Sequence, residues 1–595
     1  MTDTKDVEFE SSGTDVARST TVDVPGIDAR YGRTIRGLSP RHVQFMAIAG
    51  SIGTGLFVGI GSRLSQSGPL SLLLGYLVWG LLFIWPCNLC VAEMCAYLPV
   101  RGSIFELASR FVDPALGFAM GWTYFYTMVM LVCTEYSSVA MVMQYWTSSV
   151  NPAVWIAGAM MVCVALNVVA VKCVRQQPLS PPFPLFVSST LCRLAMSLMP
   201  ADILCKGLRK ADLKRAFGRV FSRYYGEAEF IMASTKVLLI LGLILLTVVT
   251  MCGGNPRHDA YGFRHWKNGN AMHAYYADGA AGRFLGWWKV VLYAAFTISG
   301  PDMVALAAGE MQNPRRTIPR VTKLIFYRLL CFYVLGVLAV GVICSSRDER
   351  LLGALGNPSG GGGSAASPWV IGIENLGISG LSHVINAAIL LSGLSCANAN
   401  GQAPGFLMRC TRSGVPIYTV GLVCVLSCIT FLVSSHAAVE VFNWFVDLAT
   451  TGLIATYTCM LLIYIFWYRA RGSQRLAHRE LLLPFVAPLQ PYGAYFATGL
   501  GILALVFTAF DAFVPFKPQG FVTGYFCLPY SAALYVGCKI WRGTELVRPE
   551  KADLVSGKAA VDDECREWEE GGIDRNWRAA LVAMPFWRRC WERLW

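Results

Sequence analysis

Twelve long apolar segments recur along the chain, and they constrain its fold more than any other feature. Each approaches or exceeds the ~20 residues that an α-helix needs to cross a bilayer. The segments lie at residues 43–62, 69–97, 117–143, 152–172, 228–252, 288–308, 324–344, 381–399, 415–434, 444–467, 491–512 and 521–541. Charged residues make up 15% of the chain, against about 25% in soluble proteins. We therefore expect an all-α integral membrane protein with about 12 transmembrane helices.

The distribution of Lys and Arg between the loops predicts which side of the membrane each loop faces. Basic residues cluster before the first segment, after the sixth and after the tenth, at residues 30–41, 315–323 and 469–479. The loops at 144–151 and 435–443 contain neither Lys nor Arg. With twelve spans, this pattern predicts a cytoplasmic tail at 1–42, a membrane domain at 43–541 and a cytoplasmic tail at 542–595. No apolar leader with a small-residue cleavage site precedes the first segment, so we expect no signal peptide.

A glycine-rich sequence interrupts the first apolar segment. Residues 50–55 read Gly-Ser-Ile-Gly-Thr-Gly, and each glycine costs a helix roughly 1 kcal/mol relative to alanine. Within a membrane, irregular backbone is tolerated only where it faces protein or a water-filled cavity. A break here would expose backbone N–H groups at a half-helix N-terminus, which suits an anion. The alternative is close packing between helices through small residues, which also enriches glycine in membrane helices.

A second interruption is predicted in the sixth segment. Residues 296–302 read Phe-Thr-Ile-Ser-Gly-Pro-Asp, in which Pro301 removes a backbone donor and favours a kink. Interrupted first and sixth helices fit a pair of broken helices around a binding site at the membrane midplane. Phe296 could cover or stack on a substrate there; packing against lipid or the protein core is the alternative.

Ionisable residues inside apolar segments are costly and are therefore functional candidates. They are Glu93, Glu135, Lys236, Asp302, Glu310 and Asp447. Glu135 and Lys236 lie deepest, so each needs a partner or water. A carboxyl group in such a site can exchange a proton, and an ammonium group can replace a metal cation electrostatically. Glu310 and Asp447 fall near the membrane interfaces and are interpreted as structural. For Glu93, Glu135, Lys236 and Asp302, a structural ion pair remains the alternative to a functional role.

Several classes of function are disfavoured. Gly59-x-Gly61 lacks the third glycine of a dinucleotide-binding motif and follows no predicted strand, and no metal-ligand cluster or nucleophile–base pair is recognisable. We therefore expect no enzyme, no metal and no cofactor. The pair Cys87 and Cys90 lies inside an apolar segment and is interpreted as core. The net charge of +13 is explained by topology and by a basic stretch at 173–223, so no nucleic-acid partner is expected.

Several stretches together resemble the fungal amino-acid permeases, the yeast amino acid transporter family within the amino acid–polyamine–organocation superfamily. The matching stretches are Gly50–Gly61, 92–94 (Ala-Glu-Met), 98–103, 111–119, 225–230, 308–315, 441–444 and 487–493. The resemblance covers roughly 36–172 and 224–565. It implies a leucine-transporter-like five-plus-five inverted repeat, with broken helices 1 and 6, followed by two further C-terminal helices.

The resemblance also implies a function and partners. It implies proton-coupled uptake of amino acids across the plasma membrane, so that an amino acid, a proton and the lipid bilayer are the partners. Trafficking or ubiquitin machinery is a candidate partner of the tails. By similarity, the substrate carboxylate would be bound by Ser51, Gly53, Thr54 and Gly55.

Further roles are implied in the other spans. The α-amino group and side chain of the substrate would meet Phe296, Thr297, Ser299, Gly300 and Asp302. Thr456 lies where the family commonly carries a tryptophan that lines the side-chain pocket, and the family usually has Glu in place of Asp302. Lys236 resembles the lysine that replaces a sodium ion in sodium-independent relatives. Glu135 resembles a glutamate that is a candidate for substrate or proton coupling.

Two larger departures from the family bear on whether the chain is active. Residues 173–223, rich in proline and basic residues, are absent from relatives and resemble a translated intron. A stretch that relatives carry is missing between Ala399 and Asn400, which shortens the eighth span. An inactive product of a faulty gene model is therefore one alternative to a transporter. A non-transporting amino-acid sensor of the same fold, which would keep the binding site and signal through its tails, is the other.

Overall fold

The structure, a computed structural model, describes most of the predicted membrane domain. The described residues are 43, 44, 47, 50–100, 102–147, 149–174, 234–267, 269–309, 311, 313–356, 367–378, 380–399, 417–434, 436, 438–474 and 483–570. Across these ranges the chain forms helices joined by turns and loops, without a β-strand. The all-α prediction is therefore confirmed for the described part. The tail at 1–42, residues 175–223, Glu310, Asn400 and residues 571–595 lie outside the described residues.

Seven helices within the described ranges are long and apolar enough to cross a membrane. They are Pro69–Tyr97, Pro114–Met143, Ser234–Met251, Gly279–Ala307, Pro314–Ile343, Ala438–Ser473 and Tyr492–Ala512. Helices Pro518–Tyr525 and Cys527–Arg542 meet at 45° and make an eighth span if they are counted together. Shorter apolar helices lie at Pro152–Val164, Leu381–Cys396 and Thr419–Ser434. Each of these helices overlaps a predicted apolar segment, as expected for a multi-pass membrane protein.

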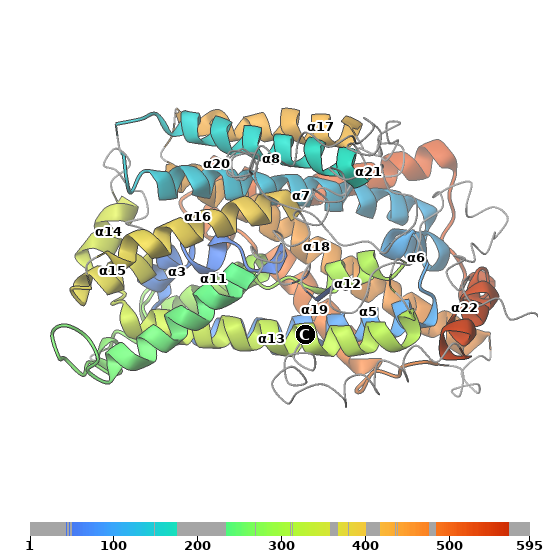
Figure 1. Ribbon diagram of the computed structural model, residues 1–595. Helices are drawn as coiled ribbons and strands as arrows, with labels where there is room; N and C mark the ends of the chain where they lie inside the picture. Colours follow the sequence, from blue (N-terminus) through green and yellow to red (C-terminus); the bar gives the residue numbers. More distant parts are fainter. Residues whose placement is uncertain are drawn as a thin grey trace, which may run out of the picture.

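Figure 1 labels the individual elements, and most of the helices run along one common direction. The α-helices, with the π-helical turn η2, are α3 (Ile60–Ser67), α4 (Pro69–Trp79), η2 (Gly80–Ile84), α5 (Trp85–Tyr97), α6 (Ser103–Phe111), α7 (Pro114–Met143), α8 (Pro152–Val174), α11 (Gly279–Thr297), α12 (Pro301–Ala307), α13 (Pro314–Ile343), α14 (Glu349–Gly356), α15 (Pro368–Asn375), α16 (Leu381–Ala399), α17 (Ile417–Ser427), α18 (Ala438–Ser473), α19 (Tyr492–Val506), α20 (Pro518–Tyr525), α21 (Cys527–Arg542) and α22 (Lys558–Glu570). The 3-10 turns are η1 (Thr54–Leu56), η4 (Arg264–Trp266), η6 (Cys428–Ser434), η8 (Phe510–Ala512) and η9 (Pro549–Lys551).

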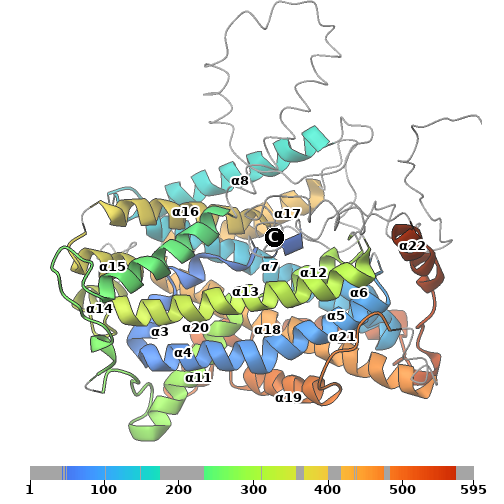
Figure 2. The ribbon, with the colours of Figure 1, turned by 60° about the horizontal axis from the view of Figure 1, so that its bottom comes forward.

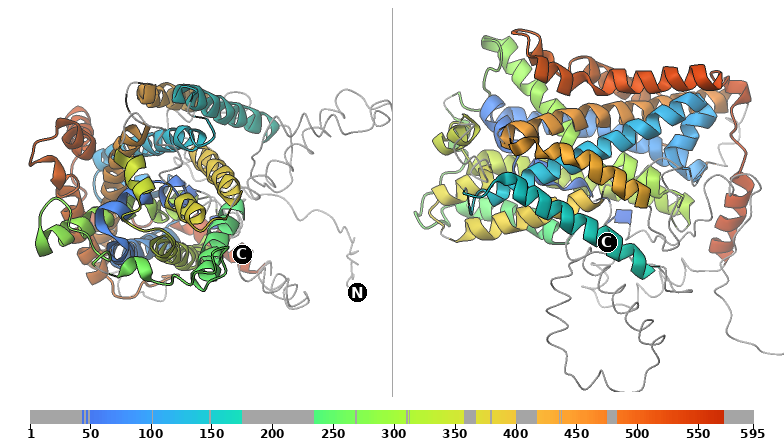
Figure 3. Two further views of the ribbon diagram at one scale, coloured as in Figure 1. Left: turned by 90° about the vertical axis from the view of Figure 1, so that its left-hand side faces the viewer. Right: turned by 90° about the horizontal axis from the view of Figure 1, so that it is seen from above.

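Helices α7 and α18 form the centre of the bundle. They pack along each other, α16 and α21 pack against α7, and α19 packs against α18. The apolar stretch of α18 is 78% buried and that of Gly279–Ala307 is 83% buried, whereas that of Ser234–Met251 is only 33% buried. Helix α8 lies at the edge of the bundle in both views of Figure 3, and its side chains Met161 and Val162 are exposed. The high burial of α18 fits its place at the centre of the bundle, because a helix that is apolar on all sides is surrounded by other helices.

The first apolar segment is interrupted where the glycines lie. Gly53 has extended backbone at φ −108° and ψ −170°, η1 follows it, and α3 starts only at Ile60. In the sixth segment α11 ends at Thr297 and α12 starts at Pro301. Gly300 between them has a φ of 152°, which residues with a side chain rarely adopt, so glycine is required there. The two interruptions lie together, because α11 packs against both η1 and α3.

The two ends of the bundle carry different short elements. Helices α14 and α15 lie at one end, and α6 and α22 lie at the other (Figures 1 and 2). The chain after α21 packs against the second of these ends: the Val547 amide bonds to the carbonyl of Val112 at 2.8 Å, and Tyr97 donates to the carbonyl of Leu554 at 3.3 Å. The described part of the predicted C-terminal tail is thus docked on the helices.

Asp113 fixes the start of α7 at this end of the bundle. Its carboxylate accepts hydrogen bonds from the amide of Ala115 at 2.8 Å, from Lys539 at 2.7 Å and from Tyr535 at 3.0 Å. Burial acts to raise the pKa of Asp113, but the hydrogen bonds from Lys539 and the Ala115 amide outweigh it and hold the pKa below its usual value. This carboxylate therefore joins α7 to α21.

We expect Asp113→Asn to lower the stability of the protein by about 1 kcal/mol at neutral pH, because the charged partner of Lys539 is lost. A carboxyl group whose pKa falls on folding stabilises the protein above its unfolded pKa of about 3.9, and that contribution disappears as the pH falls through the folded pKa. Thermal unfolding of the detergent-solubilised chain should show a gap between wild type and variant at pH 7 that closes only in strong acid. Asp278→Asn is the matched control, since Asp278 precedes α11 without a side-chain capping bond. An equal loss in the two variants would contradict the assignment.

Candidate functional site

The backbone of the interrupted first segment is held in place through its carbonyl oxygens. Six carbonyls between residues 50 and 57 accept hydrogen bonds of 2.6–3.4 Å from side chains elsewhere in the chain. In the order of carbonyls 50, 51, 52, 55, 56 and 57, the donors are Cys396, Tyr333, Ser392, Tyr293, Trp369 and Ser367. The Thr54 carbonyl accepts from two amides of its own turn. Because these oxygens are occupied, they are not available to coordinate a cation, whereas a backbone N–H group favours an anion. The Gly53 amide bonds to the Ser51 carbonyl at 3.1 Å, so the amide of this turn that bonds to a side chain of another helix is that of Thr54.

Glu135 of α7 occupies the amide side of this turn. Its Oε1 accepts a hydrogen bond from the Thr54 amide at 3.3 Å, and its Oε2 accepts one from Thr54 Oγ1 at 2.8 Å. Glu135 is 4% exposed, and Lys236, which is 1% exposed, interacts with it electrostatically. A Cβ atom on Gly53 would overlap Glu135 Oε1, so the glycine leaves room for the carboxylate. A carboxylate of the protein itself thus stands where the turn presents an N–H group.

A small cavity lies at the interruption. It has a volume of about 30 Å³ and is bordered by the first segment, α7, α11, α13, α16 and α18. Seven of the predicted site residues line it: Ser51, Gly53, Gly55, Glu135, Phe296, Thr297 and Ser299. This volume holds about one or two water molecules. The surrounding segments must therefore separate before a larger solute enters.

The first and sixth segments meet closely at this cavity. A Cβ atom on Gly55 would lie 2.8 Å from Phe296 Cε1 and 2.9 Å from Thr297 Cγ2, which real side chains do not tolerate. Thr297 Oγ1 donates a hydrogen bond to Tyr76 at 3.0 Å, which anchors the end of α11 to α4. Glycine at 55 is therefore required for the two segments to touch.

Other predicted site residues do not line the cavity. Asp302 is 1% exposed and accepts hydrogen bonds from Tyr124 and Tyr457, each at 3.0 Å, and from the Gly300 amide at 3.2 Å. Thr456 donates to the carbonyl of Gly452 in its own helix at 2.8 Å. Thr54 and Lys236 do not line the cavity either: Thr54 bonds to Glu135, and Lys236 interacts with Glu135 electrostatically. Gly300 contributes its backbone amide to Asp302.

Several lining residues were not predicted from the sequence. Tyr333 donates to the Ser51 carbonyl at 2.6 Å, and Cys396 donates to the Gly50 carbonyl at 3.4 Å. Leu131 and Leu453 add apolar surface beside Phe296. These residues are uncharged and ordinary in apolar helices, so no local signal in the sequence marks them. Only the rotation of each helix decides that they face the cavity.

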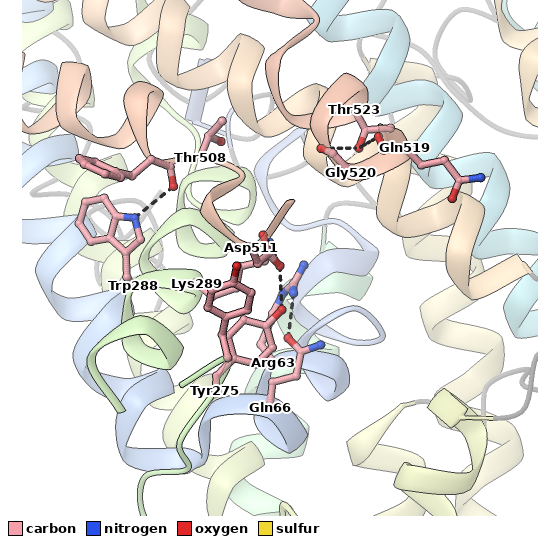
Figure 4. Close-up of polar contacts among 12 residues, drawn as sticks. Arg63, Gln66, Tyr275, Trp288, Lys289, Thr508, Asp511, Gln519, Gly520 and Thr523 are labelled. Atoms are coloured by element: carbon pink, nitrogen blue, oxygen red, sulfur yellow. Dashed lines mark hydrogen bonds and ion pairs between the residues drawn. The ribbon is translucent and has the colours of Figure 1, made fainter. Parts of the chain in front are cut away.

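A network of charged side chains lies on the α3 and α11 side of the interruptions. Lys289 binds Asp511 at 2.9 and 3.0 Å, and Tyr275 donates to Asp511 at 2.7 Å (Figure 4). Arg63 lies over the ring of Tyr293, 5.2 Å from its centroid. Asp447, interpreted from the sequence as a structural residue near the interface, interacts electrostatically with Lys289 and Arg63. The network thus links the two half-helices α3 and α11 to α18 and η8.

The fold and the site together define a class of protein. A multi-pass α-helical membrane protein with paired helix interruptions around a buried cavity has the arrangement of solute transporters. The amino acid permease family model matches residues 42–177 and 220–548, so the chain belongs to the amino acid permease family. The members of this family are transporters and not enzymes.

Individual relatives cover nearly the whole chain. A proline-specific permease of Emericella nidulans is 36% identical over 573 residues, which is 93% of each chain. A probable proline-specific permease of Schizosaccharomyces pombe is 37% identical over 94% of this chain and 96% of its own. A dicarboxylic amino acid permease of Saccharomyces cerevisiae is 33% identical over 93% of this chain and 84% of its own. Among solved structures, a manganese transporter of Eremococcus coleocola aligns with a TM-score of 0.46 at 10% identity, over 84% of this chain and 93% of its own.

Proposed function

We propose that the protein is a secondary active transporter that takes up amino acids across the plasma membrane by alternating access, driven by the proton gradient. The observation that carries the proposal is the cavity at the first interruption, where the backbone carbonyls are already bonded and Glu135 accepts the Thr54 hydrogen bonds. A turn of this kind suits the carboxylate of an amino acid. The α-amino group would then lie toward Thr297 and Ser299, and the substrate side chain toward Phe296.

Proton coupling follows from the position of Glu135. A substrate carboxylate bound at Gly53, Thr54 and Gly55 would come close to the Glu135 carboxylate, and two neighbouring carboxylates resist being charged together. Protonation of Glu135 removes this repulsion and releases the Thr54 amide for the substrate. The positive charge of Lys236 beside Glu135 takes the place of the positive charge that a bound sodium ion provides in other carriers. This substitution supports a sodium-independent transport cycle.

The proposed topology has twelve spans, a five-plus-five inverted repeat with two additional helices, and both tails in the cytoplasm. The match between apolar helices and predicted segments supports the span count, and the Lys and Arg distribution supports the orientation. L-Proline is the proposed first substrate to test, because two of the relatives described above are named proline-specific permeases and because the cavity wall of Leu131, Leu453 and Phe296 is apolar.

Uptake by intact cells tests the proposal directly. Permease-deficient fungal cells expressing the chain should accumulate labelled L-proline at acidic external pH, and a protonophore should abolish the accumulation. Because residues 178–219 fall outside the family-model match, a second version without residues 173–223 belongs in the same experiment. Failure of both versions to accumulate any amino acid, when surface expression is verified, would contradict the proposal.

A non-transporting sensor remains the second candidate, since it would keep the same binding cavity. Binding of L-proline without uptake would favour the sensor. A third outcome is possible: the full chain neither binds nor takes up L-proline, but the version lacking 173–223 does both. That outcome would identify the full chain as an inactive product of a faulty gene model.

A further inference from the structure

A second and larger cavity lies near the start of α18, away from the central site. It has a volume of about 410 Å³, and none of its lining residues lines the central cavity. The α18 residues in its wall are Glu440, Asn443, Trp444 and Asp447. They are spaced i, i+3, i+4 and i+7, so they share one face of the helix. This wall carries two carboxyl groups, an amide and an aromatic ring.

The other wall is formed by residues 516–523 and carries the opposite electrostatic character. Lys517 precedes α20 without a side-chain capping bond, and the α20 residues Gln519, Gly520 and Thr523 line the cavity. Amides in the first turn of a helix have no intrahelical acceptor, so those of Gln519 and Gly520 add partial positive charge to the charge of Lys517. Phe516 provides an apolar surface beside them. The cavity therefore lies between an acidic face and a basic edge.

The position of the cavity places it on the outer side of the proposed topology. Gln474, directly after α18, donates hydrogen bonds to the carbonyls of Pro549 and Ala552 in the docked C-terminal segment. The cavity lies near the opposite end of α18, roughly 40–50 Å away at 1.5 Å per residue. With the tails in the cytoplasm, the cavity opens outside the cell.

The cavity is also connected to the central site through charge. Asp447 belongs both to the cavity wall and to the network with Lys289 and Arg63, which stand on α11 and α3. These two half-helices lead to the interruptions at the central cavity. Figure 4 shows the Lys289 and Asp511 contacts together with Gln519, Gly520 and Thr523 of α20. A cationic group that binds near Asp447 would compete with Lys289 and Arg63 for the negative charge of the Asp447 carboxylate.

We propose that this cavity is an outer binding site for a zwitterionic amino acid, occupied before the substrate reaches the central site. The α-ammonium group binds on the face of α18 that carries Glu440 and Asp447, and the carboxylate binds at Lys517 and the first-turn amides of α20. The volume suits a free amino acid with part of its hydration shell, and it exceeds what a single metal ion or proton requires. The proposal rests on the proposed function, because an amino acid must be the transported solute.

Chemical labelling of the full-length protein in cells tests the outer site. Thr523→Cys keeps a side chain of similar size in the cavity wall, and a membrane-impermeant methanethiosulfonate added outside should modify it. L-Proline should slow the modification several-fold, measured by mass spectrometry of the peptide that contains residue 523. N-acetyl-L-proline lacks the ammonium group and L-prolinamide lacks the carboxylate, so neither should protect. Gln519→Cys, with an exposed side chain, provides a second reporter if residue 523 reacts slowly.

Two further variants separate the outer site from the central one. Glu440→Gln or Lys517→Gln should raise the half-protecting concentration of L-proline about two- to fivefold, as expected for an exposed charge. Asp278→Asn, an exposed acid outside the cavity, should not. Protection should persist in Gly55→Ala, whose change lies in the central site.

The outcomes distinguish this proposal from the proposed function. Absence of protection in a protein that takes up L-proline overturns the outer site and leaves the transporter intact. Protection that disappears in Gly55→Ala also overturns it, because the reporter would then be sensing closure rather than occupancy. Equal protection by the blocked analogues overturns the zwitterion assignment. Protection in the wild-type chain, when neither this chain nor the version lacking residues 173–223 shows uptake, would keep the outer site and contradict the transporter.

Discussion

Replacing Gly55 by alanine is expected to lower amino-acid uptake strongly while leaving the protein folded. The added Cβ would lie 2.8 Å from Phe296 Cε1 and 2.9 Å from Thr297 Cγ2, at the point where the two interruptions touch. Both partners are buried, and Thr297 is anchored to Tyr76, so neither can move away cheaply. Overpacking of this kind costs about 1–3 kcal/mol, which corresponds to a roughly 5- to 150-fold loss if it falls on substrate binding or closure.

The matched control is Gly158→Ala on α8. A Cβ atom there meets nothing within 4 Å, and alanine favours a helix by up to about 1 kcal/mol over glycine. Initial rates of labelled L-proline uptake, normalised to surface protein, should be at wild-type level for Gly158→Ala and at least about fivefold lower for Gly55→Ala. Wild-type uptake by Gly55→Ala would show that the close contact of the two segments is dispensable and would contradict the proposed site.

Replacing Glu135 by glutamine is expected to uncouple transport from the proton gradient. Glutamine keeps one oxygen that can accept from the Thr54 amide, and its NH2 group can donate to Thr54 Oγ1, but it cannot exchange a proton. The variant should therefore exchange L-proline across the membrane without accumulating it. Accumulation in cells, and its dependence on external pH, should be lost, whereas counterflow in proteoliposomes should persist. Loss of coupling with retained exchange is the result that distinguishes a proton site from a purely structural carboxylate.

Asp302→Asn is the matched variant, because Asp302 is the other buried carboxylate at the two interruptions. Its carboxylate is held by Tyr124 and Tyr457 and does not line the cavity. We expect this variant to lose stability but to keep pH-dependent accumulation in the protein that remains folded. If Asp302→Asn uncoupled transport from the proton gradient and Glu135→Gln did not, the assignment of Glu135 as the proton site would be contradicted. Asp302 would then be the proton site and Glu135 the structural carboxylate.

The sequence by itself determined the class of fold and the location of the two interruptions. Hydropathy is a property of consecutive residues, so the apolar helices could be located without knowing how they pack. The glycines at 50–55 and the Gly300-Pro301 pair act on their own backbone, so the breaks are equally local. Glu135 stood out because an ionisable group in an apolar segment is costly wherever that segment lies.

Only the tertiary structure decided which side chains meet. Asp302 and Thr456 are polar residues in the expected segments, yet they bond to other helices or to their own backbone instead of lining the cavity. Tyr333 and Cys396 line it and hold the broken segment, although nothing in their own neighbourhoods marks them. The outer cavity likewise joins Asp447 to Lys517 across a long separation in the chain. Such contacts depend on the rotation and depth of each helix, which packing against the other helices sets and which no local stretch of sequence contains.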